Sequence, residues 1–468
     1  MDAHQPYTLA PRKVPALDPD FRPPVLARRA LREAGQHRPT PAMVEIALEQ
    51  ADGSVFRSAT TLLPEDHPNS TANFFHVERW LKFLLWSRGG FRAHVAGPAS
   101  LVNALARYYK DTATGRFDAE MMGTRIYERP FEIVACTPER LPAPHATTQA
   151  LGRHWNGCRI GFDLGGSDRK VAAVIDGRPV FSEEVVWSPI GEADPQYHYD
   201  GIMDSLRRAA SHLPRVDAIG GSAAGVYVNN RVKVASLFRG VPHEAFARRV
   251  KGLFLEIRQA WNNVPLEVVN DGEVTALAGS MALGDNAVLG IALGTSTAGG
   301  YVTPEGTITS WLNELAFVPV DYNPNAPVDE WSGDRGCGAK YFSQQAVGRL
   351  VKPAGIDVPP HTPLPETLHH VQTLMQTGDP RARRIYETIG AYLGYTVAHF
   401  ADFYEFRHLL ILGRVTSGPG GEVILTEARQ VIETEFPELA ARVALHTPDE
   451  KDKRHGQAIA AASLPVVP

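Results

Sequence analysis

Two segments of this chain share one pattern, in which a glycine-rich turn joins two short apolar strands. The first is residues 161–167 (GFDLGGS), and the second is residues 290–300 (GIALGTSTAGG). Such turns present backbone N–H groups without obstruction by side chains, so each can cradle a phosphate group. Either segment alone could equally be an ordinary β-hairpin. Together, in two similar halves, they predict a nucleotide held in a cleft between two lobes.

Two further segments place polar or glycine residues where a predicted strand ends. Residues 268–272 (VVNDG) lead into a helix over 273–282. Asp271 could therefore accept a proton from a substrate hydroxyl, or it could simply cap the helix. Residues 409–418 (LLILGRVTSG) form a buried strand and a glycine turn. This turn could let an adenine approach the backbone, or it could be an ordinary strand-to-helix connection.

Taken in order, these segments resemble the ROK family (repressors, open reading frames, kinases), a sugar-kinase branch of the actin-like ATPase superfamily. FDLGGS resembles the phosphate loop DxGGT, VVNDGEVTALAG resembles NDxNxAxxxE, and IALGTSTAGGYV resembles the second phosphate loop, LGTGxGxG. AIGGSAAGV at 218–226 resembles GxPGxV, and ILGRVTSG resembles the adenosine segment. The resemblance covers residues 158–463. It implies an α/β protein with the two-lobed actin-like ATPase (ribonuclease H-like) kinase fold.

The resemblance also implies an activity, in which a glucokinase- or hexokinase-like enzyme uses ATP and Mg²⁺ to phosphorylate a hydroxyl of a sugar or sugar-like alcohol. Asp271 maps onto the catalytic base of the family. The residues expected to hold the substrate are Asn270, Glu314, Ser222 and Gly225. Those expected to hold the phosphates are Gly165, Gly166, Ser167, Lys170, Gly294, Thr295 and Ser296. Adenosine is expected against Gly413, Arg414 and Gly418, with Mg²⁺ held by Asp163 through water.

Two motifs depart from the family pattern. Residues 314–317 read ELAF where the family has E-x-G-H, so the histidine is lost. Residues 330–339 read EWSGDRGCGA where the family has the zinc motif CxCGxxGCxE, so Cys337 is the one cysteine left and Ala339 replaces a sugar-binding glutamate. We therefore expect no zinc, and the sequence does not identify which sugar is the substrate. The alternative is a catalytically reduced, ROK-like sugar-binding or regulatory protein.

Composition and other motifs disfavour several classes of protein. The chain has 468 residues and a net charge of −5, which does not suit a general nucleic-acid or membrane-surface binder. Its three separated cysteines suit a reducing cytoplasm, and neither a signal peptide nor an apolar run of about 20 residues is present. A Walker A motif is absent, and residues 220–225 (GGSAAG) lack the second glycine of a dinucleotide-binding motif. The expected partner is a small sugar or polyol, with a homodimer as one candidate assembly.

Proline content and periodicity divide the chain. The predicted parts are an extended Pro/Arg-rich arm (1–41), an N-terminal α/β domain (42–137), a linker (138–157), a first kinase lobe (158–285), and a second lobe (286–468) whose last helix could return to the first. The N-terminal domain begins with a β-hairpin and shows no three-helix pattern, which argues against a DNA-binding helix-turn-helix. Its ββαβ order also raises the hypothesis of a degenerate kinase lobe. An unrelated small α/β domain is the favoured alternative, because that order is common.

Overall fold

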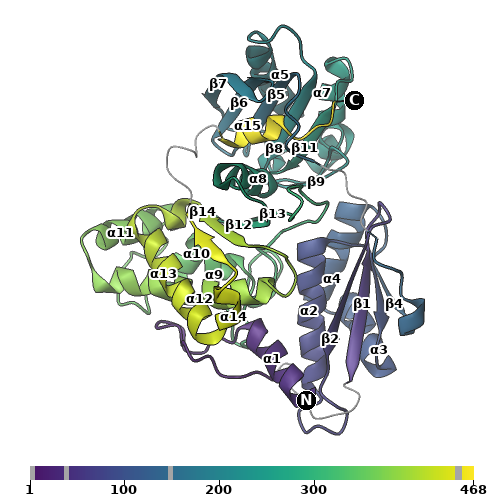
Figure 1. Ribbon diagram of the computed structural model, residues 1–468, viewed down its shortest axis with the longest axis vertical. Helices are drawn as coiled ribbons and strands as arrows, with labels where there is room; N and C mark the ends of the chain where they lie inside the picture. Colours follow the sequence, from purple (N-terminus) through teal and green to yellow (C-terminus); the bar gives the residue numbers. More distant parts are fainter. Residues whose placement is uncertain (1–5, 36–41, 146–150, 448–455, 468) are drawn as a thin grey trace.

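The structure, a computed structural model, describes residues 6–35, 42–145, 151–447 and 456–467. Three α/β parts build the molecule. Figure 1 shows the first kinase lobe at one end of the long axis, with the second lobe and the N-terminal domain side by side at the other end. Helix α8 (Asp271–Leu283) lies between the first lobe and the other two parts. The region around the start of this helix is therefore where all three parts can contribute to a site.

The first lobe is a five-stranded mixed sheet in the order β11-β8-β5-β6-β7. Its strands are β5 (Cys158–Leu164), β6 (Asp168–Ile175), β7 (Arg178–Val186), β8 (Ala218–Ala223) and β11 (Leu266–Asn270). Helices α5 (Pro195–Ala210) and α7 (Leu253–Ala260) share an apolar core with the sheet. The closing helix α15 (Gly456–Ala462) packs on the sheet so closely that a Cβ at Gly161 would lie 1.8 Å from the Ala458 carbonyl oxygen. Only glycine at this strand position permits such an approach.

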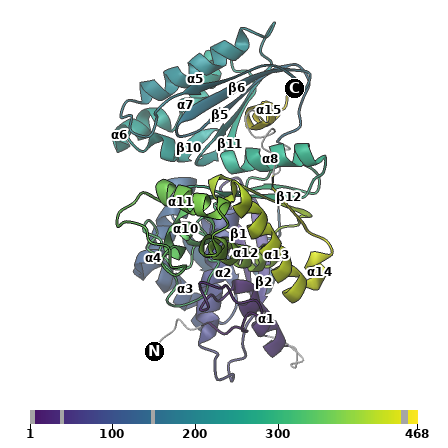
Figure 2. The same ribbon diagram turned by 90° about the vertical axis from the view of Figure 1, so that its left-hand side faces the viewer.

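The second lobe has a four-stranded sheet in the order β13-β12-β14-β15. Its strands are β12 (Val288–Leu293), β13 (Thr297–Val302), β14 (His408–Leu412) and β15 (Ala444–His446). Its helices are α9 (Ala339–Phe342), α10 (Gln344–Leu350), α11 (Leu364–Gln376), α12 (Pro380–Phe400), α13 (Pro419–Glu435) and α14 (Pro437–Ala440). Both lobes thus begin with a glycine-turned hairpin, as their sequences predict. Along the chain, the short hairpin of β9 (Val226–Val228) and β10 (Arg231–Val234) and the one-turn helix α6 (His243–Ala245) connect β8 to α7. Figure 2 shows α6 at the outer edge of the first lobe.

The N-terminal domain is a sheet in the order β2-β1-β3-β4 with helices α2, α3 and α4. Its strands are β1 (Met43–Glu49), β2 (Val55–Thr61), β3 (Arg92–Ala96) and β4 (Glu132–Ala135). Its helices are α2 (Ala72–Arg88), α3 (Ala99–Asp111) and α4 (Ala113–Glu120), followed by a π-helical segment, Met121–Tyr127. Helix α2 is buried on all sides from His76 to Arg88, and its aromatic residues contact side chains of the second lobe. This burial makes α2 the structural link between the domain and the kinase fold.

Strand direction excludes the hypothesis that the N-terminal domain is a degenerate kinase lobe. Its strand β3 runs antiparallel to β1, whereas β8 of the first lobe runs parallel to β5. The difference arises because two strands precede the helix α2, while three precede α5. The domain is therefore the unrelated α/β unit that was the favoured alternative.

The prediction of an extended arm over residues 1–41 is wrong in part, because Pro24–Gly35 forms helix α1. Proline suits the first turn of a helix, where a backbone N–H would have no partner inside the helix. Upstream of the helix, Phe21 is fully buried and its ring centroid lies 4.7 Å from that of Tyr392. The segment thus packs along the second lobe. Across the described residues, the helices are all too short or too polar to span a membrane.

Candidate active site

A cavity of about 970 Å³ lies where the three parts meet. The first lobe contributes Gly225 and the junction of β11 with α8, which carries Asn270 and Asp271. The second lobe contributes the turn between β12 and β13 and two later loops, around residues 314–317 and 330–331. The N-terminal domain contributes Trp86 and Met121. The lining of this cavity therefore contains the predicted base, Asp271, and most of the predicted substrate residues.

Asn270, and not Asp271, caps helix α8. The Asn270 side chain accepts a hydrogen bond from the Gly272 N–H (2.7 Å) and donates one to the Gly225 carbonyl (2.8 Å). Asp271 is the first helical residue, and one of its oxygens accepts from the same N–H at 3.0 Å. Its other oxygen has no hydrogen-bond partner among the described residues. The sequence left open whether Asp271 only caps the helix, and this geometry leaves its carboxylate available to a substrate.

Burial and a neighbouring carboxylate make Asp271 a stronger base than a free aspartate. Burial, followed by the charge of Asp163, raises the pKa of Asp271 to about 6. Burial and the charge of Asp271 likewise raise the pKa of Glu314 to about 7. A base with a pKa near the working pH is suited to proton transfer, and clustered shifted groups are typical of active sites.

The second phosphate loop lies at the same cavity. Gly294, Thr295 and Ser296 all line it, and the two hydroxyl side chains are exposed. Neither hydroxyl makes a hydrogen bond with the described residues, whereas the Gly294 carbonyl is held by the Gln344 N–H at 2.9 Å. The loop backbone is thus held by helix α10, and the two hydroxyl groups remain available as donors at the cavity.

The first phosphate loop and its acidic neighbours lie next to this cavity and do not line it. Lys170 is 3.0 Å from Asp168 and 3.7 Å from Asp163, and the Ser167 hydroxyl donates to Asp168 at 2.9 Å. Burial raises the pKa of Asp163, which the Ser222 hydroxyl opposes by donating to it at 2.6 Å. Ser222 is fully buried and is not at the cavity surface, so its predicted contact with the substrate is not met here.

Mg²⁺ fits this region only as an ion held mainly by phosphate. Asp163 has one oxygen bonded to Ser222 and the other 3.7 Å from Lys170. The described residues contain no group of three or more His, Cys, Asp or Glu side chains able to hold a metal. Mg²⁺ usually takes one or two carboxylates together with substrate phosphates and water, so a single buried aspartate suits it.

A second cavity of about 510 Å³ lies between α8, α15 and the end of β14, and it is lined by the predicted adenosine residues Gly413 and Arg414. Gly413 has φ +102°, and a Cβ there would lie 2.5 Å from the Leu293 carbonyl oxygen, so this turn requires glycine. Gly418 lies instead at a small neighbouring cavity that His369 also lines. Arg414 also lowers the pKa of Asp168, after Lys170 and Ser167, which places the first loop near this pocket.

Sequence reasoning missed the part of the cavity lining that is rich in aromatic residues. It is formed by Trp86, Met121, Phe317, Glu330 and Trp331. The Phe317 ring stands where the resemblance places a sugar-binding histidine. Glu330 and Trp331 are the first two residues of the altered zinc motif. The sequence therefore showed that this segment departs from the family pattern, but it did not show that the two side chains line the cavity. Nothing in the sequence indicated that Trp86 and Met121 of the N-terminal domain reach this site.

Cys337 is a poor candidate for a metal ligand. Burial, followed by the charge of Asp334, raises the pKa of its thiol to about 12, and metals bind the thiolate. The absence of zinc stays a prediction.

The chain matches no protein-family model and no curated protein. Solved structures do match. One is a ROK hexokinase from Thermus thermophilus, at 19% identity and a TM-score of 0.51, over 66% of this chain and 97% of that one. Another is a ROK family transcriptional regulator, a homologue of the E. coli MLC protein, at 18% identity and a TM-score of 0.51, over 69% and 81%.

These similarities show the fold. The chain has the two-lobed actin-like ATPase fold of the ROK family, as the sequence predicts. About a third of this chain has no counterpart in the hexokinase. Because the similar structures include both an enzyme and a regulator, the activity has to be argued from the site itself.

Proposed function

We propose that this protein is a kinase that transfers the γ-phosphoryl group of ATP to a hydroxyl of a sugar or sugar-like alcohol. The observation that carries the proposal is the Asp271 carboxylate at the cavity wall. One of its oxygens is free of hydrogen bonds with described residues, its pKa is about 6, and the donors of the second phosphate loop line the same cavity.

In the proposed reaction, Asp271 accepts the proton of the substrate hydroxyl as the hydroxyl oxygen attacks the γ-phosphorus, and ADP leaves. Asn270 and Glu314 would hold neighbouring hydroxyls. The backbone and hydroxyl groups of Gly294, Thr295 and Ser296 would hold phosphate oxygens, with the first loop and Lys170 on the other side. Mg²⁺ bound near Asp163 would neutralise phosphate charge. Closure of the two lobes would exclude water and limit ATP hydrolysis.

The adenosine would occupy the cavity beside Gly413 and Arg414. This pocket is mostly apolar, with Leu410, Leu412 and the small residues of α8 and α15 as its walls. An apolar slot with a few polar groups suits a purine ring. The pocket lies along α8 and the catalytic cavity lies at the N-terminal end of the same helix, with the first phosphate loop close to Arg414.

A sugar-binding protein without turnover is the second candidate. It is favoured by Phe317, an apolar ring lining the cavity where the resemblance places a polar sugar ligand. The Asp271 carboxylate with its raised pKa speaks for turnover instead, because binding alone does not need a base.

One experiment separates the two. The purified full chain is incubated with ATP, Mg²⁺ and a panel of sugars, sugar alcohols and their glycosides, and ADP formation is followed. The kinase proposal predicts ADP formation that depends on one class of substrate and gives a phosphorylated product. Binding in a thermal-shift screen without ADP formation would overturn it in favour of the second candidate.

A further inference from the structure

The two cavity loops that carry Glu314 and Trp331 are held in place by the N-terminal domain through two separate sets of contacts. The first set is at the C-terminal end of α2, where the last carbonyls of a helix have no partner within it. Here the backbone N–H groups of Leu312, Asn313 and Glu314 donate to the carbonyls of Arg88, Ser87 and Trp86 at 3.3, 3.1 and 3.0 Å. The helix end thus fixes the loop that carries Glu314.

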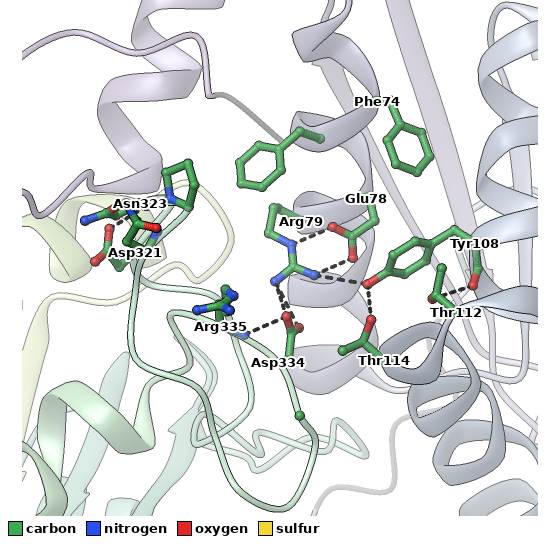
Figure 3. Close-up of a pocket in the computed structure, with 14 residues that line it drawn as sticks. Phe74, Glu78, Arg79, Tyr108, Thr112, Thr114, Asp321, Asn323, Asp334 and Arg335 are labelled. Carbon is green, nitrogen blue, oxygen red and sulfur yellow. Dashed lines mark hydrogen bonds and ion pairs between the residues drawn. The ribbon is translucent and has the colours of Figure 1, made fainter. Parts of the chain in front are cut away.

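The second set is a buried cluster of charges. Arg79 and Lys82 of α2 contact Asp334 at 2.9 and 2.8 Å, and Lys82 also contacts Asp118 at 2.9 Å. Figure 3 shows Arg79 between Glu78 and Asp334, at the edge of a separate cavity of about 640 Å³. Burial alone would raise the pKa of Asp334, but the charges of Arg79 and Lys82 outweigh it and hold the pKa well below its usual value. The loop that carries Trp331 is therefore fixed to the same helix.

Between these two attachments, four aromatic rings from both parts of the molecule lie in contact. The Trp86 and Phe317 centroids are 4.3 Å apart, and Trp331 lies 5.0 Å from Phe317 and 5.4 Å from Phe117. Trp86 is anchored by its indole N–H, which donates to Asp118 at 2.8 Å. Trp86 is 1% exposed and Phe317 9%, whereas Trp331 is 54% exposed. Trp331 is thus the ring that this stack presents at the cavity.

We propose that Trp331, supported by Phe317, Trp86 and Phe117, forms a subsite for an apolar substituent of the substrate, best filled by an aromatic ring. The substrate class is then a glycoside or similarly substituted sugar, and not a free hexose. This inference rests on the proposed function, because it assumes that the sugar hydroxyl lies at Asp271.

Size and chemistry support this assignment. The cavity is at the upper end of the roughly 300–1,000 Å³ found for pockets that hold drug-sized ligands, so it has room beyond one sugar ring. Its lining contains polar groups suited to sugar hydroxyls, Asn270, Asp271 and Glu314, together with the rings of Trp86, Phe317 and Trp331. A half-exposed tryptophan held by other rings loses little freedom when a ligand ring stacks on it.

The test compares each free sugar with its phenyl glycoside. Binding to the full chain carrying Asp271→Asn, which prevents turnover, is measured by isothermal titration in the presence of ADP and Mg²⁺. Phenyl glucoside, phenyl mannoside and phenyl N-acetylglucosaminide are set against glucose, mannose and N-acetylglucosamine. We expect at least one phenyl glycoside to bind about tenfold more tightly than its parent sugar, since burying a phenyl ring contributes on that scale.

Variants assign this preference to the ring stack. Trp331→Ala should reduce the affinity ratio to about 1, and the variant should keep its fold because the side chain is exposed. Phe117→Leu should reduce the ratio about threefold, because it removes one supporting ring of the N-terminal domain and keeps an apolar side chain. Trp155→Ala in the linker before the first lobe and Phe74→Leu, which lies at the separate cavity in Figure 3, are the matched controls and should keep the full ratio.

The outcomes separate this inference from the proposed function. Sugars that bind and are phosphorylated with no preference for phenyl glycosides would overturn the subsite alone, as would a preference that survives Trp331→Ala. A preference that depends on Trp331, without ADP formation by the parent protein, would uphold the subsite and overturn the kinase. A panel in which nothing binds would overturn both.

Discussion

The proposed nucleotide side and the proposed substrate side of the cleft are built in different ways. The nucleotide side uses glycine turns at strand ends, such as the Gly413 turn and the tight turns of the hairpins β5–β6 and β12–β13. The substrate side combines loops of the second lobe with helix α2 of a separate domain. The first arrangement depends on local sequence, and the second depends on contacts between residues more than 200 positions apart, such as Arg79 and Asp334.

This difference indicates that the substrate side can change in sequence while the nucleotide side stays the same. A phosphate loop needs glycines and backbone N–H groups, so its sequence is constrained whatever the substrate. The substrate wall can be rebuilt by any element that supplies side chains at the right place. In this protein the rebuilding element is a domain with its own sheet, fixed to the kinase fold by a buried charge cluster.

The largest expected effect comes from breaking that cluster. Lys82→Met should lower the free energy of unfolding by about 3–5 kcal/mol, because it leaves Asp118 and Asp334 buried without their shared cation. Urea denaturation followed by tryptophan fluorescence measures this change. Lys352→Met, at an exposed lysine, is the control and should change stability by less than about 0.5 kcal/mol. A loss below about 1 kcal/mol in Lys82→Met would show that the cluster does not hold the domain.

The next effect tests the catalytic base. Asp271→Asn should lower kcat by roughly 10²-fold or more, because it removes the proton acceptor. The fold should remain, since Asn270 supplies the cap of α8. Steady-state kinetics and thermal melting of the same preparation measure both properties. Asp111→Asn, at an exposed aspartate that ends α3, should turn over at the parent rate. Parent-like turnover by Asp271→Asn would contradict the assignment.

The pH profile sharpens the comparison at the level of charge. The pKa of Asp271 is raised to about 6, so its carboxylate can accept a proton above that pH. As the pH falls through 6 the carboxylate becomes protonated and can no longer act as the base. kcat/KM should therefore fall about tenfold per pH unit below pH 6. Asp163→Asn removes the neighbouring charge that raises the pKa of Asp271, so the acidic limb of the residual activity should move to lower pH in this variant. A limb that stays in place would show that the two carboxylates are not coupled.

Much of the nucleotide side could be predicted from the sequence. Residues 161–167 and 290–300 carry their own turn chemistry, and the hairpins β5–β6 and β12–β13 form where those residues predict them. The helix α1 was not predicted because its one proline, Pro24, indicates extended chain, whereas in the structure it occupies the first position of the helix. The sequence left two roles open for Asp271, helix cap and catalytic base, because both place an aspartate at the start of a helix. The structure shows that the neighbouring Asn270 makes the cap.

The substrate side could not be predicted for a physical reason. Trp86 lies in a helix that is buried on all sides. Apolar and polar residues therefore do not separate onto two faces in its sequence, and the pattern does not indicate which side contacts another part of the molecule. Its placement beside Phe317 results from packing between parts of the chain, and apolar side chains carry no directional signal of their partners. The same holds for Met121, in the π-helical segment after α4.

The smallest expected effect tests whether Ser222 acts on the nucleotide side or on the substrate side of the cleft. The sequence resemblance places Ser222 at the substrate, but its buried hydroxyl donates to Asp163 at 2.6 Å. Ser222→Ala should therefore raise the KM for MgATP about fivefold, the equivalent of about 1 kcal/mol for one hydrogen bond, and should leave the KM for the sugar unchanged. Loss of this bond also raises the pKa of Asp163 further, so the defect should grow as pH falls. Ser205→Ala, at a buried serine on α5 that accepts from Arg169, is the control and should keep both KM values. A higher KM for the sugar with an unchanged KM for MgATP would return Ser222 to the substrate side.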